Sequence, residues 1–385
     1  MKILKKLGLA IAAATLSVST ATHAADDKIS IGFTGPLSGG AALYGENTLS
    51  GLKMAVEEIN ASGGVKFGGK QHTLDLVSLD DRYTPAQAAT NAKRLVQESK
   101  APVVFVPHSG GVFALQDFNE KSNFLLMAYT SVPSVTEKGN KLTVRIPPTF
   151  DGYVEAFTDY AQTNQGKKLG IAGATHEYAK IWTDMITDYW KKQGGTIVVS
   201  NPMDYNKSAD FYTGVSKVIA ADPDVMFVGG ASEPTGLVVQ QARQLGYQGG
   251  FIVMDQAKID EVAEVAGGLE MVEGAIGVMP LSVYDTKAAQ DFVKRYKAKF
   301  NKVPGSEAAY NYLALNAVAK AMELAGSSDP TAIRKHLGEA LKTMDDSKNP
   351  YEVVEITDDG GFVTETLLAV VEDGKIVRKP VEPKK

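Results

Sequence analysis

The sequence predicts an α/β protein that has mostly parallel sheets and is divided into two lobes. Short apolar runs typical of buried strands alternate along most of the chain with longer segments whose apolar residues recur at helical spacing. This alternation is typical of βαβ units, in which helices join consecutive parallel strands. The chain has 385 residues, and single hydrophobic cores stop growing at about 250–300 residues, so two lobes are expected.

The individual elements follow from these two periodicities. Apolar runs predict strands at 29–34, 74–79, 103–106, 124–128, 169–174, 197–200, 225–228, 251–254 and 275–278. Helical spacing predicts helices at 46–60, 84–98, 150–163, 178–192, 210–220, 235–245, 259–266, 288–300, 307–325 and 331–341. Thr84-Pro85-Ala86-Gln87 has the pattern of a capping box with proline at the first helical position.

The segment from residue 29 to residue 65 carries the most specific pattern in the chain. It reads ISIGFTGPLSGGAALYGENTLSGLKMAVEEINASGGV. A predicted strand leads through a loop rich in glycine and serine into a helix. The helix is expected to stop at Ser62-Gly63-Gly64, because glycine tolerates the left-handed conformation found at helix ends. Open α/β sheets bind ligands at strand-to-helix loops of this kind.

This segment resembles the opening of the Leu/Ile/Val-binding-protein family of type I periplasmic solute receptors. In that family GPLSG…A.YG….G…A…INA.GG follows the first strand, and the same letters occur here in the same order. The resemblance implies two Rossmann-like lobes with a ligand cleft between them, joined by three crossovers of the chain. It places 25–147 with 279–350 in the first lobe and 148–278 with 351–385 in the second.

Residues 1–24 have the layout of a secretory signal peptide. Three lysines precede an apolar run, and Thr22-His23-Ala24 has the small residues of a cleavage site. The alternative is a membrane anchor, but an apolar run of roughly 12 residues is shorter than the roughly 20 that span a bilayer. The sequence contains no cysteine, which excludes a lipidated cysteine. We therefore expect a protein that is released into the periplasm without a lipid anchor.

Charge and composition exclude several classes of function. The formal net charge is −5, and it becomes −8 when the three lysines of residues 1–24 are removed. That is the wrong sign for binding nucleic acid. Without cysteine there are no disulfides, thiolate metal sites or cysteine nucleophiles. The histidines show no metal-ligand spacing, and the common hydrolase and nucleotide-binding motifs are absent from the sequence. We expect no metal and no cofactor.

The loop at 107–111 supplies the first candidate binding residue. Ser109 precedes a helical pattern, where a hydroxyl and successive backbone N–H groups can hold a carboxylate. Spacing alone favours the alternative that Ser109 is an ordinary helix cap. The family resemblance reverses that order, because a serine at this place in the family contacts the α-carboxylate of the ligand. Tyr44, in the first loop, could form a wall of the same pocket.

The turn Tyr129-Thr130-Ser131 follows the next predicted strand. The resemblance implies backbone contacts to the ligand from this turn and a hydroxyl contact from Ser131. Family members usually have a small residue where this chain has Tyr129, so the ring either lines the pocket or turns away from it. The alternative is an ordinary loop with polar turn residues.

Two residues of the second lobe are expected to complete the site. Tyr178 corresponds to an aromatic residue that packs on the ligand in the family, although Ala179 follows it where glycine is usual. Asp255 ends a predicted strand, where the family often has an acid that pairs with the ammonium of the ligand. Each has an ordinary alternative, and for Asp255 it is a helix cap or a solvated charge. Ala231 stands where several members carry a ligand-packing tyrosine, so the pocket is expected to be larger or differently shaped.

The expected function is that of a periplasmic solute-binding subunit of an ABC importer, without catalytic residues. The resemblance implies a branched-chain or similar amino acid as the ligand, a membrane permease as the partner, and a monomeric chain. The alternative ligand is an aromatic or aliphatic carboxylate or an amide, in transport or in sensing. A hydrolase with Ser109 as nucleophile is a further alternative, but His108 is not expected to reach that hydroxyl and no orienting acid is evident.

The predicted signal peptide gives a direct test. Mass spectrometry of periplasmic extract should find a mature N-terminus near Ala25, because the apolar run is short and the cleavage site has small residues. Recovery of the chain only in washed membranes, with residues 1–24 intact, would contradict the prediction.

Overall fold

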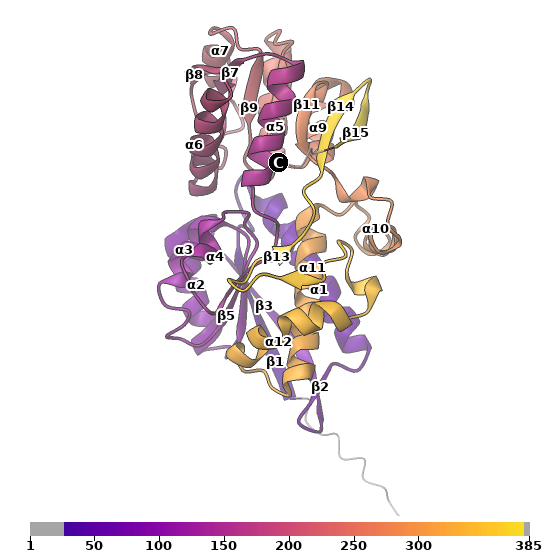
Figure 1. The fold of residues 1–385 in the computed structure, drawn as a ribbon. Helices are drawn as coiled ribbons and strands as arrows, with labels where there is room; N and C mark the ends of the chain where they lie inside the picture. The colour runs from indigo at the N-terminus through magenta and orange to yellow at the C-terminus, as the bar shows by residue number, and fades with distance from the viewer. Residues whose placement is uncertain (1–26, 381–385) are drawn as a thin grey trace, which may run out of the picture.

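The structure, a computed structural model, describes residues 27–380 and consists of two α/β lobes stacked end to end (Figure 1). The predicted signal peptide lies outside the described residues. Each lobe is built on its own sheet, and helices cover both faces of each sheet. The expected fold class, two Rossmann-like lobes joined by three crossovers, is confirmed. Among residues 27–380 no helix is both long and apolar enough to cross a membrane.

The first lobe has a six-stranded sheet in the order β2-β3-β1-β4-β5-β6. All neighbouring strands are parallel except β2 and β3, which form an antiparallel pair. The strands are β1 Asp27–Gly35, β2 Val65–Phe67, β3 Lys70–Asp80, β4 Val103–Val106, β5 Leu125–Ala128 and β6 Thr143–Arg145. The strand order reverses between β1 and β4, which is where open α/β sheets form a ligand crevice at the carboxyl ends of their strands.

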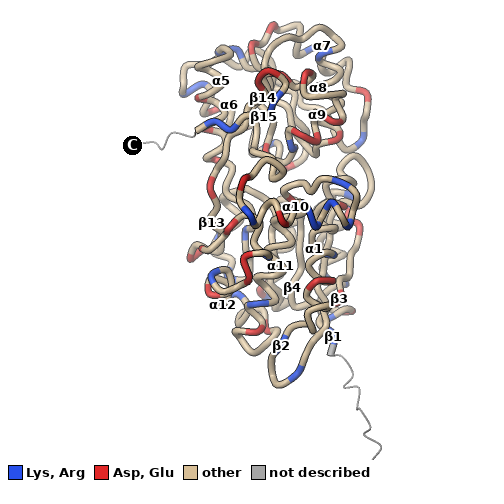
Figure 2. The backbone as a smooth tube through the Cα atoms, turned by 90° about the vertical axis from the view of Figure 1, so that its right-hand side faces the viewer, with Lys and Arg blue, Asp and Glu red and all other residues tan. Residues whose placement is uncertain are grey.

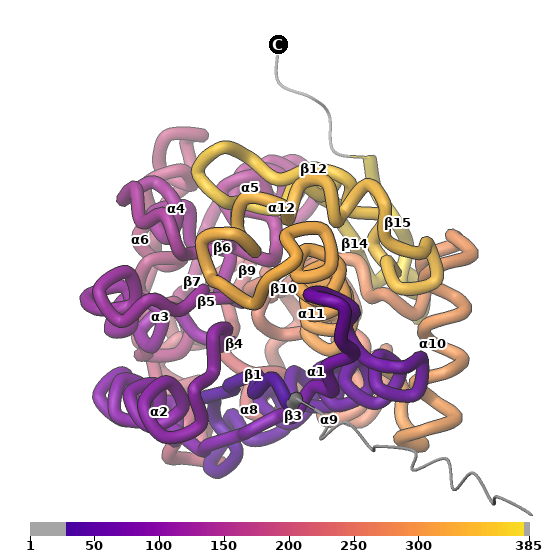
Figure 3. Tube along the Cα trace, turned by 90° about the horizontal axis from the view of Figure 1, so that it is seen from below, coloured from indigo at the N-terminus to yellow at the C-terminus, as the bar shows by residue number. Residues whose placement is uncertain are grey.

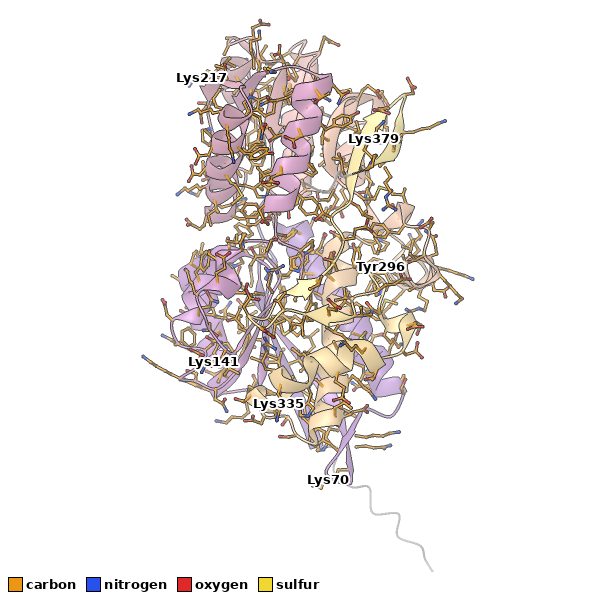
Figure 4. All side chains as sticks on the ribbon, viewed as in Figure 1. Lys70, Lys141, Lys217, Tyr296, Lys335 and Lys379 are labelled. Atoms are coloured by element: carbon orange, nitrogen blue, oxygen red, sulfur yellow. The ribbon has the colours of Figure 1, made fainter. Side chains whose placement is uncertain are left out.

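Helices pack against both faces of this sheet, as the view from below shows (Figure 3). One group lies around α1 and α11, and the other contains α2 and α3. The helices of the lobe are α1 Ala42–Ala61, α2 Pro85–Gln97, α3 Ser109–Gln116, α4 Ser134–Glu137, α10 Lys287–Phe300, α11 Ser306–Ala325 and α12 Pro330–Thr343, with the 3₁₀ turns η2 Leu281–Val283 and η3 Asp346–Lys348. Tyr296, labelled in Figure 4, is a buried residue of α10, which belongs to the group around α1 and α11.

The second lobe has a seven-stranded sheet in the order β15-β14-β11-β10-β9-β7-β8. Its strands are β7 Lys168–Ile171, β8 Thr196–Ser200, β9 Val225–Val228, β10 Gly250–Val253, β11 Ala275–Val278, β14 Leu368–Glu372 and β15 Lys375–Lys379. Its helices are α5 Asp151–Asn164, α6 Glu177–Lys192, α7 Tyr212–Ile219, α8 Ser232–Gln244 and α9 Ile259–Ala266, with the 3₁₀ turn η1 Leu269–Val272. The last two strands form an antiparallel hairpin on the edge of an otherwise parallel sheet.

The chain passes between the lobes three times, after β6, after β11 and before β14. The short strands β12 Glu355–Ile356 and β13 Phe362–Val363 pair with each other and lie beside the first sheet. There the backbone N–H of Arg145 donates to the carbonyl of Gly360, and Phe362 packs in the apolar core of the first lobe. The expected boundary at residue 350 therefore falls too early, because the third crossing comes after β13.

The core of the second lobe is rich in aromatic side chains that lead toward the crevice. Trp182 on α6 is fully buried, and its ring stacks at 5.4 Å on Phe150 and at 5.5 Å on Phe227. Buried apolar side chains continue from this core to α2 and α3 of the first lobe. The two lobes are therefore in contact, as expected of a closed form.

The helix at α2 begins as predicted but not by the predicted mechanism. Thr84 is the N-cap residue, yet its hydroxyl makes no cap to the helix. Instead Thr84 Oγ1 donates to the carbonyl of Asp81 at 2.9 Å, which ties the helix to the loop after β3. The capping box predicted from the sequence is therefore wrong.

Charged side chains are spread over the outside of both lobes. Figure 2 shows lysine and arginine interspersed with aspartate and glutamate along the chain of each lobe. In Figure 4, Lys217 lies at one end of the molecule and Lys70 at the other, so these labelled side chains lie far from the contact between the lobes.

The close packing of α1 on α11 depends on a glycine. A Cβ atom at Gly51 would lie 2.0 Å from the carbonyl oxygen of Ala308, which is backbone and cannot turn aside. Gly51→Ala should therefore lower the free energy of unfolding by about 1–3 kcal/mol, as overpacking does. Urea denaturation measures this change.

The matched control for Gly51→Ala is Gly338→Ala on α12. A Cβ atom there would come no closer than 3.3 Å, to a methyl group of Ile356. Its free energy of unfolding should change by no more than about 1 kcal/mol, because alanine favours a helix over glycine. Equal effects of the two substitutions would contradict the packing argument.

Candidate functional site

A small cavity lies between the lobes, at the carboxyl ends of strands from both sheets, and we name it the first chamber. Its free volume is about 20 Å³, which is room for about one water molecule. All seven residues proposed from the sequence line it, namely Tyr44, Ser109, Tyr129, Thr130, Ser131, Tyr178 and Asp255. The chamber is also lined by Tyr83, Pro107, His108, Pro147, Gln256 and Lys258.

Ser109 is the first residue of α3, and its hydroxyl is left without a partner. The side chain is buried, and Oγ has no hydrogen bond within the described residues. The N-cap of α3 is His108, whose Nδ1 accepts a hydrogen bond of 3.0 Å from the backbone N–H of Gly111. The alternative that Ser109 is an ordinary helix cap is therefore wrong. A buried hydroxyl without a partner is costly, so its position facing a cavity indicates a ligand or water.

His108 is held by a buried acid on the neighbouring loop. Its Nε2 lies 2.9 Å from Oδ2 of Asp81, which also accepts a hydrogen bond of 3.1 Å from Thr34 Oγ1. Because Nδ1 accepts the cap hydrogen bond, Nε2 carries the proton and donates to Asp81. Neither ring nitrogen is free to take a proton from Ser109, so the geometry of a serine–histidine nucleophile is not present here.

The neighbouring acid Asp80 serves a separate structural role. It accepts hydrogen bonds from the backbone N–H of Leu37 and from the hydroxyl of Ser38. These bonds fix the loop that follows β1. Asp80 and Asp81 thus point to different partners and do not form a pair of catalytic carboxylates.

The turn after β5 places Tyr129 and Thr130 in the wall of the chamber. The Tyr129 ring lines the chamber and does not turn away, and its Oη shares a hydrogen bond of 3.3 Å with Ser306 Oγ. Thr130 Oγ1 is buried and, like Ser109 Oγ, has no partner within the described residues. The Tyr44 ring packs at 6.2 Å from the Tyr129 ring, and its hydroxyl donates to the carbonyl of Pro107 at 2.8 Å.

Asp255, in the loop after β10, receives two hydrogen bonds from a single helix. The Tyr178 hydroxyl donates to its Oδ1, and Trp182 Nε1 donates to the same oxygen at 3.0 Å. Tyr178 and Trp182 are four residues apart on α6 and therefore lie on one face of that helix. Burial, and then the charge of Asp255, raise the pKa of Tyr178 far above its ordinary value, so the phenol stays protonated and remains a donor.

The helix that carries Tyr178 is capped in the same way as α3. His176 is its N-cap, and His176 Nδ1 accepts a hydrogen bond of 3.2 Å from the backbone N–H of Ala179. Burial lowers the pKa of His176 to about 3. The ring is therefore neutral at ordinary pH, as an accepting Nδ1 requires.

The sequence reasoning missed Gln256 and Lys258, which belong to the same loop as Asp255. Lys258 Nζ is buried and donates to the carbonyl oxygens of Asp255 at 2.9 Å and of Gln256 at 2.7 Å. Gln256 Nε2 donates to Tyr83 Oη of the other lobe at 2.7 Å. The position of both residues between β10 and α9 could have indicated a role, since the ends of the other strands supplied the predicted residues.

Lys258 also joins a buried polar cluster that links the lobes. Its Nζ lies 3.6 Å from Oε2 of Glu307 on α11. Asn47 Nδ2 on α1 donates to Glu307 at 2.9 Å and to Glu261 on α9 at 3.0 Å. Lys302 Nζ, also in the first lobe, donates to Asn47 Oδ1 at 2.7 Å. The Lys258–Glu307 and Asn47–Glu261 contacts join the two lobes, because Lys258 and Glu261 lie in the second lobe and the other three residues lie in the first.

Ala231 does not enlarge the first chamber. It is not among the lining residues, and it packs with apolar side chains of the first lobe. The two lobes meet at Ala231 instead.

Within residues 27–380, no three histidine, cysteine, aspartate or glutamate side chains gather as a metal-ion site would require. The polar groups of the first chamber are hydroxyls, one carboxylate, one amide and one ammonium. Such a set can hold a small polar molecule by hydrogen bonds and ion pairing.

Fold and site together define a protein that encloses a small solute between two lobes. Residues 28–375 match the family of periplasmic binding proteins, and the chain belongs to that family. The resemblance to Leu/Ile/Val-binding proteins is confirmed. A protein of Escherichia coli described as a Leu/Ile/Val-binding protein is 25% identical over 338 residues, covering 86% of this chain and 88% of that protein.

Other similar proteins agree with this membership. A Pseudomonas aeruginosa protein described as an amino acid binding protein is 30% identical over 336 residues, covering 86% of this chain and 87% of that protein. Among solved structures, the branched-chain amino acid transporter substrate binding protein LivJ of Streptococcus pneumoniae, in complex with isoleucine, matches with a TM-score of 0.78 and 24% identity, covering 92% of this chain and all of that one. A substrate-binding periplasmic protein of Ralstonia solanacearum matches with a TM-score of 0.80 and 21% identity, covering 91% of this chain and all of that one. The solved structures support the fold.

The polar cluster between the lobes should make stability depend on pH through Glu261. Burial, and then the charge of Glu307, raise the pKa of Glu261 from 4.5 to about 8. Ser232 of α8 donates to its carboxyl group, and Asp260 and Lys258 face it from the start of α9. Between pH 7 and pH 8 the folded chain keeps a proton on Glu261 that the unfolded chain has lost, while His176 is largely neutral in both states. The free energy of unfolding should therefore fall over this range as pH rises, by up to about 1.4 kcal/mol per pH unit, and level off above it.

Glu261→Gln removes this titration and should flatten the dependence, measured by urea denaturation at pH 7, 7.5 and 8. Glu264→Gln is the matched control, because Glu264 is exposed on the same helix, and it should keep the slope of the parent. A Glu261→Gln variant with the parent's slope would show that Glu261 is not the titrating group.

Proposed function

We propose that this chain is the solute-binding subunit of an ABC importer and that it captures an amino acid by closure of its two lobes. The observation that carries the proposal is the state of the Asp255 carboxylate. Asp255 is only 9% exposed, and the two side chains that donate to it, Tyr178 and Trp182, are neutral. The nearby Lys258 ammonium is directed at backbone carbonyls and at Glu307. A buried carboxylate requires a compensating charge, and the ammonium of an amino acid supplies it.

The opposite wall of the first chamber suits the carboxylate of the same ligand. Ser109 Oγ and Thr130 Oγ1 are buried donors without partners in residues 27–380, and the first turn of α3 contributes the positive end of a helix dipole. Hydrogen bonds to an ionised group are stronger than those between neutral groups. A zwitterion with its carboxylate toward the first lobe and its ammonium toward Asp255 would satisfy both walls at once.

Closure gives the protein its mechanism without any chemical step. Contacts such as that between Gln256 and Tyr83 form between lobes that meet only in the closed form. A ligand that touches both lobes stabilises this form, since closing around a ligand is the usual response of two lobes on a hinge. The closed form is the one that the membrane permease would recognise.

The relatives support the choice of ligand and of location. Similar proteins of Pseudomonas aeruginosa and Escherichia coli are named for amino acids, two of them for leucine, isoleucine and valine, so an amino acid is the first candidate for the ligand. The layout of residues 1–24 supports export to the periplasm. We expect a monomer that meets the permease after binding its ligand.

A thermal-shift screen tests the proposal. A ligand that binds only the folded state raises the melting temperature, because it adds to the free energy of unfolding. The added stabilisation is about 2.7 kcal/mol at a ligand concentration of 100 Kd. The screen should compare amino acids with aromatic acids, aliphatic acids and amides. Stabilisation by an amino acid supports the proposal, whereas stabilisation only by acids without an ammonium would overturn it.

The substitution Asp255→Asn tests the ammonium contact. Asparagine keeps an oxygen that can accept from Tyr178 and Trp182, so the site should keep its shape while it loses its charge. Leaving the ammonium unpaired in a closed site costs on the order of 3–5 kcal/mol, or roughly 100-fold or more in affinity. Calorimetry with the amino acid found in the screen measures the loss.

The matched control for Asp255→Asn is Asp184→Asn, since Asp184 is exposed on α6. It should bind as the parent does. If Asp255→Asn binds the same ligand as tightly as the parent, Asp255 is not an ammonium partner, and a ligand without an ammonium becomes the better candidate.

A further inference from the structure

A second chamber adjoins the first on the side where the chain crosses between the lobes. Its free volume is about 30 Å³, and it shares Tyr129, Ser131, Pro147 and Asp255 with the first chamber. Two of the three crossings border it, through Pro147 and Pro148 after β6 and through Met279 after β11. The carboxylate proposed to hold the ligand's ammonium therefore lies at the junction of two spaces.

Five tyrosines line most of this second chamber, namely Tyr129, Tyr153, Tyr284, Tyr310 and Tyr351. Their rings support one another. Tyr310 and Tyr351 stack with centroids 3.9 Å apart, Tyr284 meets Tyr351 edge-on at 5.5 Å, and Tyr129 lies 6.0 Å from Tyr310. The rings come from segments on either side of the crossings, so the chamber is complete only when the whole chain has folded.

The chamber offers hydroxyl groups that the protein does not fully use. Tyr351 Oη is buried and has no hydrogen-bond partner within the described residues. Tyr129 Oη and Ser306 Oγ share a single hydrogen bond of 3.3 Å, which leaves each with further capacity. An aliphatic side chain placed here would bury these hydroxyls away from water without offering them hydrogen bonds. Sites whose polar groups bond the substrate discriminate strongly against analogues that lack the bonding group.

The charges around the second chamber limit which ligand side chains it can accept. Asp255 is the one charged residue among its lining residues. An acidic side chain would meet this carboxylate without any balancing cation. A cationic side chain would compete for Asp255 with the α-ammonium of its own ligand. An uncharged group that both donates and accepts hydrogen bonds meets neither difficulty.

We infer that the second chamber is a specificity subsite for the side chain of the bound amino acid, and that it selects an uncharged polar side chain with a hydroxyl or amide group. This inference rests on the proposed function. The carboxylate of the ligand lies in the first chamber against Ser109, the ammonium lies at Asp255 between the chambers, and the side chain enters among the tyrosine hydroxyls. Preference for such a ligand would distinguish this chain from relatives named for leucine, isoleucine and valine alone, while two other relatives also have threonine in their names.

Pairs of amino acids with nearly equal shape test the subsite. Calorimetry should compare threonine with valine and asparagine with leucine, since each pair differs mainly in hydrogen-bonding groups. The polar member should bind at least about tenfold more tightly. Valine and leucine binding as well as or better than their polar partners would overturn the subsite while leaving amino-acid binding intact. Absence of binding by all four, with binding of an acid that lacks an ammonium, would overturn both proposals.

The variant Tyr351→Phe isolates one hydroxyl of the subsite. It keeps the ring that stacks on Tyr310 and removes an oxygen that has no partner within the described residues, so the fold should be retained. Asparagine should lose about fivefold in affinity, the effect of one neutral hydrogen bond, and leucine should lose none.

The matched control for Tyr351→Phe is Tyr212→Phe, because Tyr212 is exposed on α7, and both ligands should bind to it as to the parent. Equal changes for asparagine and leucine in Tyr351→Phe would overturn the subsite, since a purely structural role of the ring would affect both ligands alike.

Discussion

The buried carboxylate of Asp255 is the constraint on which the arrangement of the site depends. Removing a carboxylate from water is unfavourable unless donors and a charge replace the water. Two neutral donors on one face of α6 supply part of this replacement. They also fix the position of the loop after β10 relative to that helix, whose Trp182 is stacked in the core of the second lobe. Under the proposed function, the ammonium of the ligand supplies the charge that these neutral donors do not.

The same constraint connects the site to the closing of the lobes. The loop that holds Asp255 continues into Gln256 and Lys258, and both reach across to the first lobe. Under the proposed function, a ligand that pairs with Asp255 contacts the same segment that makes several of the inter-lobe contacts. Ligand binding and closure would then be coupled through the short stretch of chain between β10 and α9.

The parts of the fold that could be predicted are those set by local pattern. Strands such as β4, β9 and β11 were predicted with the bounds that the structure has, because buried parallel strands are short apolar runs. Residues at strand ends, among them Ser109 and Asp255, could be proposed because parallel strands bring their carboxyl ends to one edge. Their presence around one chamber agrees with that reasoning, while their contacts with a ligand remain a proposal.

The parts that could not be predicted depend on contacts between distant segments. Histidine is not a usual helix cap, so the capping role of His108 was not visible in the sequence, and Ser109 was assigned that role as the alternative. The five tyrosines of the second chamber are separated by more than 200 residues, from Tyr129 to Tyr351. Only the crossings of the chain bring them together. The third crossing itself was misplaced, because β12 and β13 are too short to leave a periodic pattern.

The cap that His176 forms on α6 has a consequence for the conditions in which the protein can work. The cap requires an uncharged imidazole, and burial lowers the pKa of the ring to about 3. Between that value and about 6.5, the ordinary pKa of histidine, the unfolded chain holds a proton on this residue that the folded chain does not. Acid therefore favours unfolding through His176, and the helix that carries Tyr178 and Trp182 becomes less stable as the pH falls below about 6.5. The donor side of the carboxylate pocket is thus the part of the site that acid loosens.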